Sequence, residues 1–174
     1  MEGNKRRYSI VTIAAAGPHV MTLVKKTREE RPPENPLGGN LAGKRLFPGI
    51  YRQRFEASQE AIKRMFREGF GVDIDKQFKD GEVHILFLAP NLSEREHEKE
   101  DWTEFHITEC WLVLFPRRPR FVVNPTSKWR IDSIEWSHRR QAYMDRISES
   151  ARRWLHWRVG DTLITGSLRN KSIL

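Results

Sequence analysis

The residues whose types and spacing suit chemistry on phosphates lie between positions 47 and 72. This stretch begins with Phe-Pro-Gly, and it places Glu56, Arg64 and Glu68 ahead of a closing Gly71. Acids and an arginine spread over a loop and a helix are typical of a segment that processes phosphates. Because few acids remain here, the stretch predicts a fold and leaves the activity open.

Basic side chains in and before this stretch predict contacts with an anion. Arg52 and Arg54 follow the Phe-Pro-Gly turn, and with Lys44 and Arg45 just upstream they make the loop electropositive. Arg64 is a further candidate for phosphate contact. Cationic side chains of this kind position phosphate groups. The alternative is a solvated basic face that binds nothing.

Aromatic and basic residues also interleave farther along, at Lys128, Trp129 and Arg130, after a basic turn at residues 117–120. This pattern suits phosphate contact combined with base stacking. The alternative is that the tryptophans fill the core. The net charge of +8 favours a polyanionic partner, which could be a nucleotide, RNA or an acidic protein surface.

Hydrophobic patterning predicts the elements that must position these residues. Apolar runs predict strands at residues 8–14, 20–25, 83–89, 105–115, 120–123 and 131–136, with a further edge beginning at 72–74. Helices are predicted at 57–70 and 137–157, and long loops at 26–43 and 91–102. This order predicts an α+β fold, an α/β/α sandwich with a mixed sheet between helices.

The first predicted helix, 57–70, carries its own start and stop signals. Ser58 can cap its beginning, and Gly71 is the better candidate for the residue that follows its end. Cys110, the single cysteine, excludes an internal disulfide and a Cys-rich zinc site. Nothing beside Cys110 would lower its pKa, so we expect a packed thiol and not a nucleophile.

The 174 residues fit one domain, which we expect at residues 8–157 between a basic tail, 1–7, and a C-terminal tail, 158–174. No apolar run approaches the roughly 18 residues of a membrane span. No apolar region of the kind found in a secretory signal follows the N-terminus. We therefore expect an intracellular protein, cytoplasmic or nuclear, with no membrane partner; the oligomeric state stays open.

The stretch from 47 to 72 resembles the Nudix box, the loop–helix–loop of enzymes that hydrolyse nucleoside diphosphates linked to another moiety. In an ungapped alignment the matching residues are Glu56, Arg64, Phe66, Glu68, Gly71 and Val72. Ile50 replaces the leading Gly, Met65 replaces the Glu after the Arg, and Gly69 replaces the second Glu of a pair. The order of elements over residues 8–157 is also similar, so the resemblance implies the Nudix fold.

The box glutamates of Nudix enzymes hold a divalent metal, Mg²⁺ or Mn²⁺, at the pyrophosphate of the substrate. The resemblance therefore implies Glu68 as a catalytic and metal-binding residue. It implies Glu56 as a metal ligand or as the ion-pair partner of Arg64. Met65 offers only a soft thioether, which Mg²⁺ binds poorly, and Gly69 offers no side chain. These departures predict inefficient hydrolysis.

Nudix enzymes often take a further Glu from a loop beyond the box, and the acidic segment 94–104 offers several acids for this role, Glu98 among them. The alternative is a solvated charged loop. Three functions stay open. The first is a binding protein with a degenerate box, and the second is an active, divergent hydrolase that uses Mg²⁺ or Mn²⁺. The third is a structural subunit of a ribonucleoprotein or protein assembly.

Overall fold

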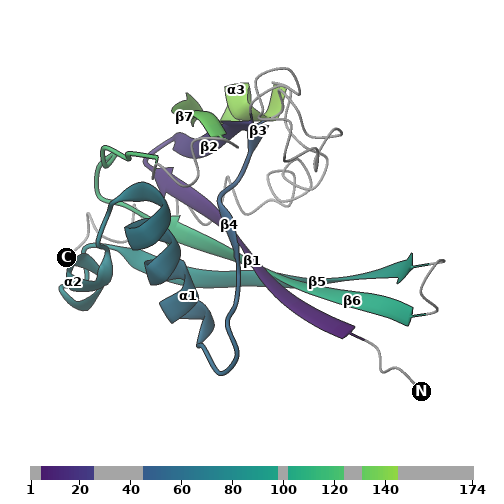
Figure 1. Ribbon diagram of the computed structural model, residues 1–174. Coiled ribbons are helices and arrows are strands. Elements are labelled where there is room, and N and C mark those ends of the chain that lie inside the picture. Colours follow the sequence, from purple (N-terminus) through teal and green to yellow (C-terminus); the bar gives the residue numbers. More distant parts are fainter. Residues whose placement is uncertain (1–4, 26–44, 98–101, 124–130, 145–174) are drawn as a thin grey trace.

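The computed structural model describes residues 5–25, 45–97, 102–123 and 131–144 (Figure 1). Within these residues seven strands form one sheet. They are β1 (Lys5–Ala16), β2 (His19–Lys25), β3 (Arg45–Leu46), β4 (Gly49–Tyr51), β5 (His84–His97), β6 (Trp102–Leu114) and β7 (Ile131–His138). The strand β1 already begins at Lys5, ahead of the start that we expected for the domain.

The sheet is mixed, as predicted. Its strand order is β3-β2-β1-β6-β5, with β4 paired to β1 and β7 paired to β2. The strands β1 and β6 run parallel, and the other pairs among the described strands are antiparallel. The strand β1 therefore lies centrally and carries the short β4, whose chain leads directly into the first helix (Figure 1).

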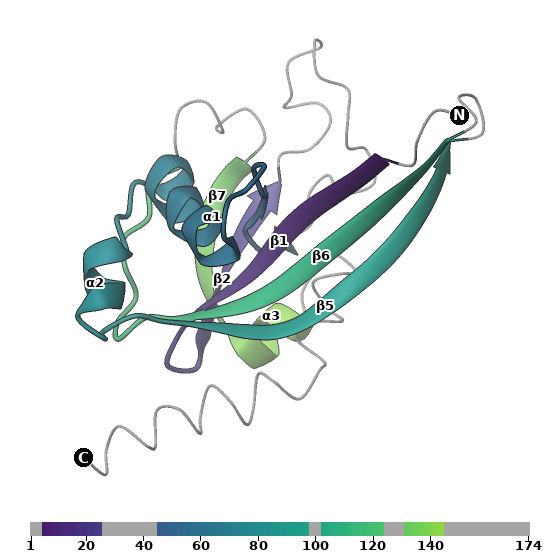
Figure 2. The ribbon, with the colours of Figure 1, turned by 90° about the horizontal axis from the view of Figure 1, so that it is seen from below.

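The helices are α1 (Ser58–Arg64), its π-helical continuation η2 (Met65–Gly69), α2 (Asp75–Lys79) and α3 (Arg139–Met144). Figure 2 shows α1 and α2 on one face of the sheet and α3 on the other. Two buried clusters separate these layers. Neighbouring residues of β6 alternate between them, as strand geometry requires: Val113 packs in the α1 cluster, and Leu112 and Leu114 in the α3 cluster.

The predicted α/β/α sandwich is therefore confirmed. The α1 cluster is built around Phe66, whose ring packs against Phe70, Phe115 and Phe121. Trp136 stacks on Phe121 in the same cluster, so this tryptophan fills core space. Within the described part of the chain, no helix is long and apolar enough to cross a membrane.

The first predicted helix is confirmed as α1 with η2. Gly71 follows its end with a φ of 67°, the left-handed conformation that glycine adopts at no steric cost. The cap prediction was wrong: Ala57 is the N-cap residue, and no side chain caps the helix. The Ser58 hydroxyl instead accepts a hydrogen bond from Arg52 at 3.3 Å.

The predicted loop at 91–102 was wrong over 91–97, because β5 continues to His97 and pairs with β6 along its whole length. Residues 98–101 lie outside the described residues. The sequence pattern placed the end of this strand at Pro90. However, β5 is an edge strand, where a proline without an N–H donor costs no ladder hydrogen bond. The chain can therefore pass Pro90 and remain a strand while its residues become polar.

Two predicted short strands do not form. At 72–74 the Val72 N–H bonds back to the Phe66 carbonyl at 3.0 Å, which closes the helix end and leads into α2 instead. At 120–123 the Val122 N–H donates to the Phe70 carbonyl, so this segment follows the helix end and not the sheet.

The last strand, β7, extends to His138, and α3 starts at Arg139, two residues later than expected. Residues 145–157 of that predicted helix lie outside the described residues.

Candidate functional site

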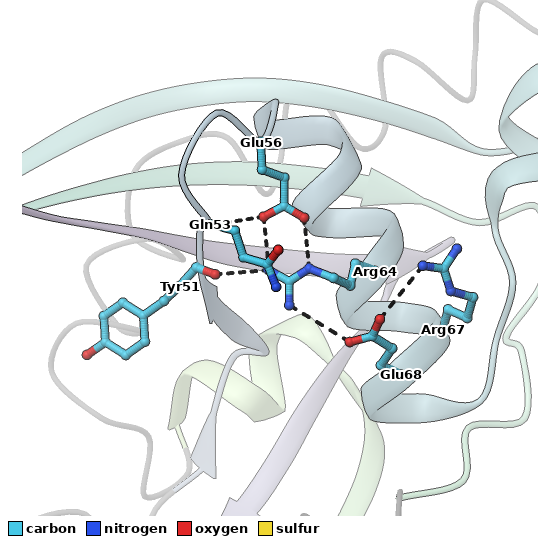
Figure 3. Close-up of polar contacts among 6 residues, drawn as sticks. All are labelled: Tyr51, Gln53, Glu56, Arg64, Arg67 and Glu68. Carbon is cyan, nitrogen blue, oxygen red and sulfur yellow. Dashed lines mark hydrogen bonds and ion pairs between the residues drawn. The ribbon is translucent and has the colours of Figure 1, made fainter.

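The loop and helix that resemble the Nudix box are held together by Glu56 and Arg64 (Figure 3). Arg64 Nε donates to Glu56 Oε1 at 2.7 Å, and Arg64 Nη2 donates to Glu56 Oε2 at 2.9 Å. The same Nη2 donates to the Tyr51 carbonyl at 3.1 Å, and the Gln53 N–H donates to the Glu56 carboxylate at 2.9 Å. The pair thus ties the end of β4, the loop and α1 into one unit.

This pair is largely withdrawn from water, since the side chains of Arg64 and Glu56 are 16% and 13% exposed. The hydrogen bonds from Arg64 lower the pKa of Glu56, against the opposing effect of burial, and Glu56 in turn raises the pKa of Arg64. The charges of Arg64 and Glu56 therefore neutralise each other within the loop–helix. Glu56 serves here as the partner of Arg64, which was one of its two predicted roles.

Glu68 lies one helical turn beyond Arg64, on η2. Its side chain is 57% exposed, and its carboxylate lies 3.9 Å from Arg64 and 3.8 Å from Arg67 (Figure 3). The two positions where the Nudix box carries further acids contribute no oxygen ligand. Met65 is buried in the α1 cluster, and Gly69 has only a hydrogen.

A cavity of about 330 Å³ opens beside Glu68 and Gly69. Apart from these two, the described residues that line it are apolar or glycine: Leu23, Gly49, Ile50, Met65, Phe70 and Ile131. We call it the box cavity. One carboxylate in an otherwise apolar lining is a poor match for Mg²⁺, which takes oxygen ligands in near-octahedral geometry. Among the described residues, no three acids, histidines or cysteines gather as metal ligands would. The described donor set therefore does not fit a bound divalent metal.

The predicted basic residues fall into different surroundings. Arg45 of β3 forms an ion pair with Glu135 of β7. Arg52 lies over the Tyr8 ring, with Glu109 at 3.6 Å, and Arg54 lies over the Phe55 ring. Lys44 and Glu98 lie outside the described residues.

Several residues near Arg52 and Arg54 were not predicted from the sequence to belong to a site. Arg6, Arg7 and Tyr8 of β1 line one cavity together with residues 51–55. The signal was present in the sequence, because basic residues adjoin aromatic ones in both segments. Only the pairing of β4 with β1 brings the two segments together, and that pairing could not be read from the sequence.

No protein-family model matches the sequence, and no curated protein matches it. Solved structures do match. The E. coli dihydroneopterin triphosphate pyrophosphohydrolase superposes with a TM-score of 0.60 at 14% identity, over 88% of this chain and 95% of that one. A MutT NUDIX hydrolase from Burkholderia pseudomallei gives a TM-score of 0.55 at 14% identity, over 87% of this chain and 97% of that one.

The NUDIX domain of Shewanella oneidensis NrtR, solved with ADP ribose, gives a TM-score of 0.58 at 10% identity, over 89% of this chain and 86% of that one. At such low identities a structural likeness establishes the fold and nothing finer. The box-like stretch lies on α1 and η2 of that fold, with its loop–helix ion pair intact. The chain therefore has the fold of the Nudix hydrolases.

Proposed function

We propose that this chain is a Nudix-fold binding protein that does not hydrolyse nucleoside-diphosphate-linked substrates efficiently. One observation carries the proposal: the box cavity contains Glu68 as its only charged lining residue among the described residues. Metal-assisted hydrolysis of a pyrophosphate needs ligands that hold the metal against both the water and the leaving phosphate. A single exposed carboxylate beside two arginines supplies too few oxygen atoms for this task.

The parts of the box that remain are those that shape the loop–helix. The Glu56–Arg64 pair and Gly71 with its positive φ maintain the turn into and out of the helix. Such a protein keeps the folded scaffold while losing the metal site. Its ligand would be a nucleotide, RNA or an acidic protein surface, because the chain carries a net charge of +8. The ADP ribose held by the NrtR domain supports the nucleotide class.

The second candidate is an active, divergent hydrolase. The observation in its favour is that Glu68 does line a cavity and is largely exposed to solvent. This reading needs Mg²⁺ or Mn²⁺ and a further acid, for which Glu98 was the sequence-based candidate.

The deciding experiment is a hydrolysis screen with Mg²⁺ and with Mn²⁺. The substrates are dinucleoside polyphosphates, nucleotide sugars, NADH, ADP-ribose and capped RNA. Each is tested with the natural chain, with Glu68→Gln, and with a complete-box Nudix hydrolase as a positive control. We expect the natural chain and Glu68→Gln to give the same near-background rate on every substrate.

The opposite result would be turnover by the natural chain that falls by about 100-fold or more in Glu68→Gln, the usual range for loss of an acid or base. That outcome would replace our proposal by the hydrolase. Thermal unfolding of both chains serves as the control, because Glu68 is exposed and its replacement should leave Tm unchanged.

A further inference from the structure

A second cavity, of about 570 Å³, lies where the start of β1 meets the loop after β4. It is lined by Arg6, Arg7 and Tyr8 and by residues 51–55, Tyr-Arg-Gln-Arg-Phe. We call it the basic aromatic pocket. The two cavities share no lining residue within the part of the chain that the structure describes, so this pocket is treated as a separate site.

The backbone brings the two basic and aromatic segments together. Ser9 is the register partner of Tyr51 in the β1–β4 pair, and the Arg52 N–H donates to the Tyr8 carbonyl at 2.9 Å. The Glu56–Arg64 pair then anchors the far end of the same loop to α1. Strand pairing and an ion pair therefore hold the backbone of the two segments that line the pocket in place.

Each aromatic ring of the pocket has an arginine beside it. The guanidinium carbon of Arg52 lies 4.8 Å from the Tyr8 ring centre. That of Arg54 lies 4.8 Å from Phe55, and that of Arg7 lies 6.0 Å from Tyr51. Two of these rings also face solvent, since Tyr51 is 57% exposed and Phe55 is 92% exposed. Rings and guanidinium planes are thus offered side by side at one surface.

The exposure of Phe55 is costly in two ways. Its large apolar ring meets water, and its φ of 64° is a left-handed conformation that a bulky residue seldom adopts. Strain of this kind persists where the surroundings impose it, and it gathers at ligand-binding sites. A glycine would fit the backbone better, so the stability of the free chain does not explain the ring.

The described residues that line the pocket carry only positive charge. Four arginines line it and, among the described residues, no acid does. Of the described acids that contact its residues, Glu109 offsets part of the charge of Arg52, and Glu56 is engaged by Arg64. Glu109 lies 3.6 Å from Arg52 and accepts a hydrogen bond from Trp111, and Glu56 is bound to Arg64. The pocket therefore complements an anion that also carries flat, unsaturated rings.

We propose that the basic aromatic pocket binds single-stranded nucleic acid, with bases stacked on Tyr51 and Phe55 and phosphates held by the arginines. Exposed aromatic platforms beside a positive groove are the physical basis of such binding, because every base has a π face. An acidic peptide would satisfy the arginines but would leave the exposed rings without a partner. A mononucleotide shares the chemistry but can occupy only part of a surface that offers several rings and four cations.

The test is fluorescence anisotropy with a labelled oligouridylate about ten nucleotides long. We expect Phe55→Gly and Tyr51→Ala each to weaken binding about tenfold, the usual cost of one lost stacking contact. Phe55→Gly should also hold or raise Tm, because glycine relieves the positive φ, so lost binding cannot be blamed on unfolding. Phe55→Trp, which keeps a ring, should bind like the natural chain.

Matched controls separate this pocket from charge and apolar surface in general. Phe87→Ala removes a ring that is 51% exposed on β5, and Arg140→Gln removes an exposed charge on α3. We expect both controls to bind normally. Arg54→Gln should weaken binding and lower the slope of log affinity against log salt by about 0.7.

Competition assays distinguish the possible ligands. Unlabelled oligouridylate and oligothymidylate should displace the probe at far lower concentrations than UMP or polyglutamate do. The proposal is overturned if the natural chain does not bind the probe, if the ring variants bind as tightly as the natural chain, or if UMP or polyglutamate competes equally well. None of these outcomes depends on the hydrolysis screen, so the proposed loss of hydrolysis stands or falls separately.

Discussion

At the scale of single residues, Glu56 and Arg64 show that an acid in a catalytic-looking stretch can serve the scaffold. Both side chains are largely buried, and they share two hydrogen bonds. The Glu56 carboxylate is therefore paired with Arg64 and stabilises the loop–helix. Glu68, which is exposed on the next turn of the helix, is left as the acid of this stretch that faces the box cavity.

We predict that Glu56→Gln lowers the free energy of unfolding at pH 7 by about 2 kcal/mol, because Arg64 loses its charged, bidentate acceptor. Chemical denaturation measures this change. Glu60→Gln is the matched control, since Glu60 is 60% exposed and its pair with Lys63 is worth less than about 1 kcal/mol. Equal stability of Glu56→Gln and the natural chain would show that the pair does not hold the loop.

The same pair has a predictable pH dependence. Arg64 lowers the pKa of Glu56 from its ordinary 4.5 in the folded chain. The stabilisation is therefore complete above pH 4.5 and is lost as the pH falls through the lower folded pKa. We expect the stability of the natural chain to fall more steeply on acidification than that of Glu56→Gln. Parallel curves for the two chains would contradict this assignment.

Cys110 gives a second test at the residue scale. It is fully buried within the sheet, and burial raises the pKa of its thiol to about 12. Because the thiolate is the reactive form, we expect no reaction with a disulfide reagent at pH 8 until denaturant unfolds the chain. Rapid labelling of the native protein would mean that β6 opens locally or that the thiol is accessible.

At the scale of elements, the box-like helix ends with two glycines, Gly69 and Gly71, that differ in backbone conformation. Gly71 has a φ of 67°, whereas Gly69 has no positive φ, and a Cβ added at Gly69 would meet nothing within 4 Å. We predict that Gly69→Ala raises the free energy of unfolding by about 0.5–1 kcal/mol through the lower entropy of the unfolded chain. Gly71→Ala should lower it by about 1 kcal/mol or more.

Thermal and chemical unfolding of these two variants, side by side, makes the comparison. Destabilisation by both substitutions would indicate that the Gly69 position also requires glycine. In that case the loss of the box acid at this position would be explained by backbone geometry. The expected opposite signs would instead mean that a side chain is tolerated there and that its absence concerns function.

The sequence predicted the elements whose signals are local. The helix from 57 to 70 has an apolar stripe and a following glycine, and the strands around residues 8–25 have a clear turn between them. It failed where a partner strand decides the outcome. The polar end of β5 is a strand because β6 pairs with it, and β4 is a strand because β1 pairs with it. Neither pairing can be predicted from the local pattern of apolar and polar residues.

The candidate site followed the same rule. Glu56, Arg64 and Glu68 could be predicted because they lie on one continuous loop and helix. The basic aromatic pocket could not, because Tyr8 and Phe55 are far apart in sequence and meet only through the sheet. The ion pair of Arg45 with Glu135 could not be predicted either, because Glu135 lies on β7, far along the chain.

At the scale of the whole molecule, the box-like loop–helix has a cavity at each end. The box cavity lies beside η2 and is mostly apolar, and the basic aromatic pocket lies before α1 and carries four arginines. Among the described residues, the four arginines of the basic aromatic pocket therefore gather in a cavity that Glu68 does not line. The proposal of binding in place of hydrolysis rests on the box cavity, where Glu68 is the one charged residue among the described residues that line it.

The central claim, that the box no longer holds a divalent metal, is tested most directly by titrating Mn²⁺ and following its EPR signal. We predict that the natural chain and Glu68→Gln give the same curve, with no saturable site tighter than about 1 mM, the weak end of protein–cation affinities. Gly69→Glu, which the backbone can accept, should bind more tightly than either, because it restores a second carboxylate. A saturable site well below 1 mM in the natural chain that Glu68→Gln abolishes would contradict the account.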